Sequence, residues 1–369
     1  MFSSEDGNAI VYCQGKFNTP WGKTAHGLVR YTKRYTIACV IDSRYAGQDS
    51  GQVLDETPNG IPVTASLEDA LETSLSLNRR ATHFVIGLAP DGGSMDKETR
   101  EAVHLALENK LHVDSGLHHF ISDEPDLAAL AAENGLTIRD IRKTPGRKEL
   151  HPFSGKISEV ASFRVALLGT DSAVGKRTTA WLLQQALDKQ GVSCEFIGTG
   201  QTAWMQGARY CIILDSLIND FVAGEIEHAI LQAWDEKHPR AMVIEGQGSL
   251  MNPLYPGGFE ILAAGRPHCV VLQHAPGRLE YDGMPGYPLH SINKQIEAIE
   301  LLSEKKVIAV TISHEQLDLA GKPPEESQAE IDRACAAITA ETGLPACDPL
   351  IHPLDTLLKA VTAAMKEIT

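Results

Sequence analysis

Short apolar runs alternate with segments of helical period along the whole chain. In the first third the runs are AIVYC, TIACVID, HFVIGLA and KLHVD, and helix-like segments separate them at residues 66–77, 97–109 and 126–134. Further along, FRVALLG, CEFIG, AMVIEG, HCVVLQH and KVIAVTIS repeat the pattern. Strands that alternate with helices are joined by crossover connections, which make neighbouring strands parallel. The alternation therefore predicts an α/β protein with parallel sheets.

The length of the chain points to two domains. A chain of 369 residues exceeds what one hydrophobic core usually organises. Residues 143–159, KTPGRKELHPFSGKISE, are polar, contain Pro and Gly and lack a clear period, which is typical of a linker. We expect a small Rossmann-like domain over residues 1–150 and a second parallel-sheet domain over residues 151–369.

The charge balance excludes several classes of partner. The chain has 33 basic and 48 acidic residues, a net charge of −15, which repels phosphate backbones and anionic lipid.

The N-terminal stretch MFSSEDGNAIVYCQG carries acids where a secretory signal would carry Lys or Arg, and no apolar run is long enough to span a membrane. The seven cysteines stand singly without C-x-x-C spacing, as buried thiols do. We expect a cytoplasmic protein without nucleic-acid or membrane partners, whose cysteines form neither disulfides nor zinc sites.

Residues 169–176, GTDSAVGK, form a Gly-rich turn between an apolar run and a helix-like segment. In such a turn, consecutive backbone N–H groups converge on an anion, the helix adds the positive end of its dipole, and the lysine adds a full charge. This context predicts a phosphate-binding turn. The expected phosphate-binding residues are Gly169, Thr170, Asp171, Ser172, Ala173, Val174, Gly175, Lys176, Arg177 and Thr178.

The turn departs from the usual pattern G-x-x-x-x-G-K-[ST] at two places. Five residues instead of four separate Gly169 from Gly175, which resembles the turn GTDT-x-VGKT of dethiobiotin synthetases. Arg177 stands where a Ser or Thr hydroxyl usually binds magnesium. Arginine binds phosphate directly, which favours a phosphate site without a metal, although Thr178 one position later keeps a metal-dependent alternative open.

A second Gly-Lys-Thr sequence, Gly22-Lys23-Thr24, lies near the N-terminus. Six residues, including a proline and a tryptophan, separate it from Gly15, too many for the usual phosphate-binding turn. We interpret it as an ordinary helix start with Thr24 near the cap, where Lys23 could still meet an anion.

Turns of small or polar residues follow five apolar runs of the second domain: GTDSAVGK, GTGQTAW, EGQGSLMNP, HAPGR and SHEQ. Ligands of open α/β sheets bind outside the carboxyl ends of the strands, so we expect the five turns to share one crevice. The alternative is that strand ends simply need turn residues.

Several motifs together resemble the DgcN family, formerly a domain of unknown function. They are KTAHGLVRY near the start, GTDSAVGKRTT, GTGQTAW, DFVAGEIE and EGQGSL. The resemblance implies an N-terminal Rossmann-like domain followed by a P-loop domain. It also implies acetyl-CoA-dependent N-acetylation of D-glutamate in D-amino-acid catabolism, with coenzyme A phosphates held by Lys176 and Arg177.

Amine acetylation needs a base, oxyanion donors and a proton for the departing thiolate. Glu245 ends a buried run just before Gly-Gln-Gly and is our first candidate for the base, the alternative being a Walker-B-like acid that orders the turn or a metal. Asp220 is a second candidate or a helix cap, and Asp215 is similar. His274 ends another run, and an ordinary histidine pKa suits proton transfer, the alternative being a structural role, which is more common for a lone histidine.

Candidates for the substrate site are fewer. Gln201 and Thr202 offer neutral hydrogen-bond donors for a carboxylate or carbonyl oxygen. Arg278, with Lys294 behind it, is the nearest cation for the carboxylates of glutamate, the alternative being that both are solvated surface residues. The competing interpretation is an ATP- and magnesium-dependent ligase or kinase related to dethiobiotin synthetase, with Thr178 and Glu245 on the metal. A third is a nucleotide-sensing or assembly module. We also expect a homo-oligomer.

Overall fold

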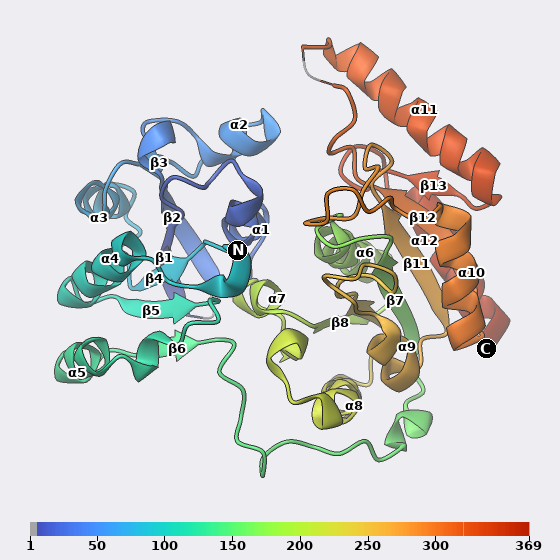
Figure 1. Ribbon diagram of the computed structural model, residues 1–369, viewed down its shortest axis with the longest axis horizontal. Helices are drawn as coiled ribbons and strands as arrows, with labels where there is room; N and C mark the ends of the chain where they lie inside the picture. Colours follow the sequence, from blue (N-terminus) through green and yellow to red (C-terminus); the bar gives the residue numbers. More distant parts are fainter. Residues whose placement is uncertain (1–5, 320, 369) are drawn as a thin grey trace. The chain divides into compact units, whose positions relative to one another are not determined.

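The computed structural model describes residues 6–319 and 321–368 (Figure 1). Residues 1–5, part of the acidic N-terminal stretch, lie outside the described residues. The chain forms two compact units. The first contains the described residues up to Pro145 together with Gly200–Ala208, and the second contains Gly146–Thr199 and the described residues from Arg209 onward. In the part of the chain that the structure describes, no helix is both long enough and apolar enough to cross a membrane.

The first unit contains a six-stranded parallel sheet in the order β3-β2-β1-β4-β5-β6, in which the direction of strand addition reverses between β1 and β4. This is the Rossmann order. The strands are β1 (Gly7–Tyr12), β2 (Tyr35–Ile41), β3 (Val63–Thr64), β4 (His83–Ile86), β5 (His112–Ser115) and β6 (Ile138–Asp140). The helices are α1 (Lys23–Arg30), α2 (Ser50–Asp55), α3 (Leu67–Ser76), α4 (Lys97–Glu108), α5 (Pro125–Glu133) and α7 (Gln201–Met205).

The second unit contains a seven-stranded parallel sheet in the order β13-β12-β11-β7-β10-β8-β9. The strands are β7 (Phe163–Gly169), β8 (Cys194–Gly198), β9 (Tyr210–Cys211), β10 (Ala241–Glu245), β11 (Cys269–His274), β12 (Val307–Ile312) and β13 (Ala346–Cys347). The helices are α6 (Lys176–Lys189), α8 (Asn219–Lys237), α9 (Phe259–Gly265), α10 (Ile292–Ser303), α11 (Pro324–Thr342) and α12 (Asp355–Ile368). The predicted fold class, two α/β domains with parallel sheets, is confirmed.

Single 3-10 turns complete the secondary structure. They are η1 (Pro20–Gly22), η2 (Ser43–Tyr45), η3 (Asp91–Gly93), η4 (Ile121–Asp123), η5 (Lys156–Glu159) and η6 (Leu214–Ser216).

Strand β7 lies at the centre of the second sheet between β10 and β11, and all seven of its residues are buried. Helices that cover both faces of a parallel sheet make such continuous apolar runs favourable. The register pairs Gly169 with Gln273 and Leu167 with Glu245. Three strand ends, those of β7, β10 and β11, therefore meet at the turn that precedes α6.

Helix α7 departs from the expected arrangement. It lies between β8 and β9 in the chain, yet it belongs to the first unit. Its Met205 is completely buried in the first core. The Gln206 amide donates hydrogen bonds to the carbonyls of Gly27 (2.8 Å) and Tyr31 (2.9 Å), and Arg34 Nε donates to the Trp204 carbonyl (2.8 Å). Apolar packing and these hydrogen bonds fix the segment to the first unit.

Candidate functional site

The turn between β7 and α6 has the backbone shape of a phosphate-binding loop. Gly175 is the residue before α6 and has φ +98°, a left-handed conformation that favours glycine. A Cβ on Gly169 would lie 2.8 Å from Lys176 Cδ and 3.0 Å from the Asp171 carbonyl oxygen, so this position also requires glycine. The first N–H groups of a helix have no carbonyl partner within it, so the start of α6 can bind an anion.

Lys176 is the first residue of α6 and is almost completely buried. Its Nζ donates hydrogen bonds to the carbonyls of Asp171 (2.7 Å) and Gly248 (2.8 Å), which connects the turn to the loop after β10. Burial lowers the pKa of this amine to about 8, against the opposing attraction of Asp171 and Glu245. A bound phosphate would restore the charged form of the amine, because the negative phosphate stabilises the positive charge in place of water.

Asp171 holds the first half of the turn in place. Its carboxylate is completely buried, and Oδ1 accepts hydrogen bonds from the Ser172 N–H and from Asn252 Nδ2, both at 2.7 Å. Oδ2 accepts from the Asp282 N–H at 2.7 Å and from Arg278 Nη1 at 3.0 Å. The Ser172 hydroxyl also donates to the Asp282 carboxylate. One carboxylate thus fastens the loops after β10 and β11 to the turn.

The position of Arg278 differs from its expected role. We expected its guanidinium to face a substrate carboxylate. Instead Nη1 donates to Asp171 Oδ2 and to the Ser172 carbonyl (2.7 Å), and the side chain is only 9% exposed. A buried guanidinium needs a counter-charge, which Asp171 supplies within the protein. Lys294, the cation expected behind it, is an exposed residue of α10.

His274 lies at the end of β11, where the sequence placed it, but its electrostatics differ from expectation. Its Nδ1 lies 3.0 Å from the Thr170 hydroxyl. Burial, with a smaller contribution from the positive charge of Arg278, lowers its pKa to about 4. The imidazole is therefore neutral at pH 7 and does not have the near-neutral pKa that made it a candidate for proton transfer.

Glu245 ends β10 in a nearly completely buried position. One carboxylate oxygen accepts a hydrogen bond from the Thr199 N–H at 2.8 Å. Burial raises the pKa of this carboxyl, and the nearby charge of Arg177 is the largest opposing influence. A buried carboxylate with a raised pKa beside cations is suited to accept a proton, and the bond to Thr199 equally suits a structural role.

Asp220 and Asp215 are both exposed. Helix α8 begins at Asn219, one residue before Asp220, and Ile218 occupies the cap position. Asp220 therefore lies inside the first turn, where a carboxylate stabilises the helix dipole without capping the helix. The sequence suggested Asp220 as a base or as a helix cap. Neither role accounts for its position better than stabilisation of the helix dipole does.

Gln201 and Thr202 belong to α7 and hence to the first unit. Both are buried, and the Thr202 hydroxyl lies 3.1 Å from that of Thr24. The Gly-Lys-Thr sequence near the N-terminus is therefore a helix start whose threonine packs against α7. Gly22 occupies the cap position, and Lys23 is exposed.

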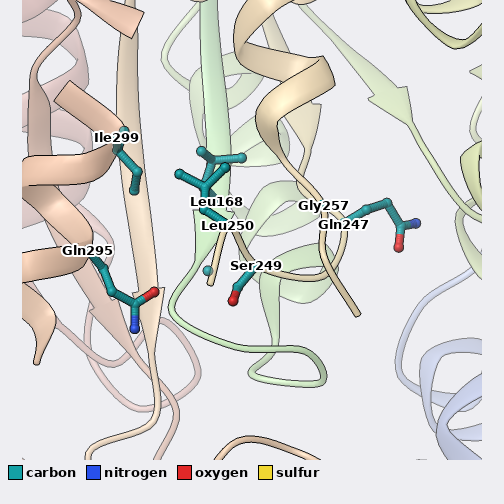
Figure 2. Close-up of a pocket in the computed structure, with 8 residues that line it drawn as sticks. Leu168, Gln247, Ser249, Leu250, Gly257, Gln295 and Ile299 are labelled. Carbon is teal, nitrogen blue, oxygen red and sulfur yellow. The ribbon is translucent and has the colours of Figure 1, made fainter. Parts of the chain in front are cut away.

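A small pocket opens beside the start of the P-loop (Figure 2). Figure 2 shows the side chains of Gln295 and Ser249 facing the same space, whereas Gln247 extends away from it. The Gln247 amide donates to the Thr199 carbonyl at 2.9 Å. The lining residues are Leu168, Gly169, Gln247, Ser249, Leu250, Gly257, Gln295 and Ile299. This lining is neutral and partly apolar.

Sequence reasoning missed three residues that organise the site. Asn252 and Asp282 bind the P-loop carboxylate, and Gln273 Oε1 accepts hydrogen bonds from the hydroxyls of Thr179 and Thr311, both at 2.6 Å. Gln273 stands beside His274 at the end of an apolar run, where an amide is unexpected, and that was an available signal. The other two lie in loops whose contacts are long-range, so no local sequence pattern indicates them.

Comparisons with known proteins agree with the two-unit architecture. Residues 43–144 match the DUF1611 N-terminal family model, a domain of unknown function described as Rossmann-like, and residues 151–358 match the DUF1611 C-terminal P-loop domain. The crystal structure of a DUF1611 family protein from Anabaena variabilis superposes with a TM-score of 0.86 at 29% identity. That match covers 97% of this chain and 100% of the solved one.

Two curated relatives carry the name D-glutamate N-acetyltransferase. The one from Tritonibacter scottomollicae is 31% identical over 289 residues, covering 77% of this chain and 82% of the relative. The one from a Pseudoalteromonas species is 28% identical over 290 residues, covering 75% and 80%. The P-loop family model alone spans more than half of the sequence, and the solved family member matches both units; the chain belongs to the DUF1611 family.

Proposed function

We propose that this protein is an N-acetyltransferase that transfers the acetyl group of acetyl-CoA to the amino group of a D-amino acid, with D-glutamate as the expected substrate in D-amino-acid catabolism. The names of the two relatives support the reaction class. The observation that carries the proposal is the P-loop in which Arg177 replaces the usual metal-binding hydroxyl and lies close enough to Glu245 to influence its pKa.

The P-loop residues fit the phosphates of coenzyme A. The N–H groups at the start of α6 provide neutral donors, while Lys176 and Arg177 provide positive charge. Glycine at positions 169 and 175 lets the loop backbone pack closely against the side chains of Lys176 and Gln273. The loop would anchor the co-substrate, and the phosphates would take no part in the bond changes.

The transfer requires the amine nitrogen to attack the thioester carbonyl, the C–S bond to break, and the amine proton to be removed. Glu245 would accept that proton, because its carboxylate is buried at the strand end beside the P-loop. The departing thiolate takes up one proton, so transfer to a neutral amine conserves protons, whereas an ammonium substrate releases one further proton to solvent. The positive charge of Arg177 would favour the ionised form of Glu245 and so oppose the effect of burial.

The test is thiol release from acetyl-CoA by the purified protein in the presence of chelator and without ATP. D-glutamate, L-glutamate and no amino acid form the three arms. Thiol release that depends on D-glutamate is the expected result. No release, together with ADP formation once ATP and magnesium are supplied, would overturn the proposal in favour of the ligase or kinase alternative, with Thr178 and Glu245 on the metal.

A further inference from the structure

Two loops beside the P-loop expose large apolar side chains. Leu254 and Tyr255 lie in the loop after β10 and are 46% and 41% exposed. Leu279 and Tyr287 lie in the loop after β11 and are 80% and 55% exposed. We call these four residues the apolar rim. Apolar exposure on adjoining loops marks a binding surface more often than exposure at isolated positions does.

The apolar rim is fastened to one half of the P-loop. Asn252 donates to Asp171 Oδ1, and its own Oδ1 accepts the N–H groups of Leu254 (2.8 Å) and Tyr255 (2.9 Å). The loop after β11 is fixed to the same carboxylate by the Asp282 N–H. The two loops also meet, since a Cβ on Gly283 would lie 2.8 Å from Leu254 Cδ2.

The cations of the phosphate site, Lys176 and Arg177, belong to the start of α6, whereas residues 250–258 and 279–290, which contain the apolar rim, carry no Lys or Arg. The two groups adjoin, because Lys176 Nζ donates to the Gly248 carbonyl in the loop after β10. A diphosphate held at the start of α6 therefore has one substituent that can extend toward cations and one that can extend over apolar loops.

The charges of the rim loops decide which substituent suits them. Residues 250–258 carry no charged side chain, and residues 279–290 carry two acids, Glu280 and Asp282, without a Lys or Arg. The nearest cation, Arg278, is engaged by Asp171. A phosphorylated ribose would be repelled here, whereas an uncharged chain with methyl groups and amide N–H donors finds apolar contacts and carboxylate acceptors.

We propose that the apolar rim binds the pantetheine arm of coenzyme A. This inference rests on the proposed function, because it assumes that the diphosphate of coenzyme A occupies the P-loop. The arm runs from the diphosphate over Leu254 and Tyr255, and the adenosine with its 3′-phosphate lies on the side of α6.

The experiment measures binding by calorimetry of three probes: coenzyme A, 4′-phosphopantetheine and adenosine 3′,5′-bisphosphate. Leu254→Ala and Tyr255→Ala are the rim variants, and Leu301→Ala is the control, because Leu301 is an 82% exposed leucine of α10. Losing one partly buried apolar side chain from the contact should weaken coenzyme A and phosphopantetheine about tenfold and leave the bisphosphate unchanged.

The remaining outcomes of the binding experiment separate failure of the rim proposal from failure of the proposed function. If the wild type binds coenzyme A and the rim variants bind it equally well, the rim proposal fails and the proposed function stands. If the rim variants weaken the bisphosphate instead, the rim binds the nucleoside, which overturns the assignment. If they change only the oligomeric mass in light scattering, the rim is an interface between copies of this chain. If the wild type binds neither coenzyme A nor phosphopantetheine, the proposed function itself fails.

Discussion

At the scale of single residues, the P-loop surrounds its charged groups with protein rather than water. Lys176 donates to two carbonyls, Asp171 accepts four hydrogen bonds, and Glu245 accepts the Thr199 N–H. Burial moves the pKa of Lys176 down and that of Glu245 up, so each group is closer to neutrality than in water. A ligand phosphate or an amine proton therefore has a larger effect here than on an exposed surface.

The pKa of Lys176 predicts how coenzyme A affinity depends on pH. In the free protein the amine loses its proton as pH rises through about 8, and a bound phosphate favours the protonated form. Binding should therefore take up a proton, and affinity should fall above about pH 8 by at most about tenfold per pH unit. Calorimetry between about pH 7 and pH 9 tests this. Lys176→Ala should bind more weakly and lose the slope, whereas an affinity that stays constant in the wild type would contradict the prediction.

Glu245→Gln separates the two roles of that residue. Glutamine keeps an oxygen acceptor for the Thr199 N–H but cannot take a proton, so turnover should fall about a hundredfold or more. The dissociation constant for coenzyme A should stay within about twofold of the wild type. Because burial raises the carboxyl pKa, the wild-type rate should also decline on the acid side at a higher pH than an ordinary glutamate would give. Equal losses of turnover and affinity would assign Glu245 a structural role.

At the scale of elements, the sequence predicted the strands and the turn that depend on local residue pattern. Each of the nine apolar runs contains an observed strand, and the Gly-Lys turn joins β7 to α6 as expected. The short strands β3, β6, β9 and β13 have two or three residues each, too few to show a period. The bond from Arg278 to Asp171 joins residues 107 positions apart, and no local pattern encodes it. For that reason Arg278, which the sequence suggested for the substrate carboxylates, instead forms an ion pair with Asp171 of the P-loop.

Asp171→Asn should loosen two loops at once. An amide can replace neither the negative charge opposite Arg278 nor both acceptors, and breaking a buried ion pair by removing one partner costs about 3–5 kcal/mol. Amide hydrogen exchange should therefore accelerate in the loops after β10 and β11, while β7 itself stays protected. Asp235→Asn, which changes an exposed carboxylate of α8, is the matched control and should change neither loop. Faster exchange in one loop only would show that Asp171 does not connect them.

At the scale of the whole molecule, the chain does not divide at a single linker. It leaves the second unit after Thr199, contributes Gly200–Ala208 to the first, and returns at Arg209. The sequence placed GTGQTAW with the strand ends of the second sheet because it follows an apolar run like the other four turns. What the sequence could not show is that the apolar side chain of Met205 fills the core of the first unit.

Stability measurements on each unit test whether Gly200–Ala208 belongs to the first unit. Met205→Ala removes a completely buried side chain from the first core and should cost about 2–5 kcal/mol of unfolding free energy there. Met242→Ala is the matched variant, because Met242 is equally buried in the second core. Amide hydrogen exchange shows which unit each of the two variants destabilises. Met205→Ala should accelerate exchange in β1 and β4 by about thirtyfold or more, and Met242→Ala should do so in β7 and β10. If Met205→Ala instead exposed β7 and β10, α7 would be energetically part of the second unit, and the association of Gly200–Ala208 with the first would be a matter of proximity alone.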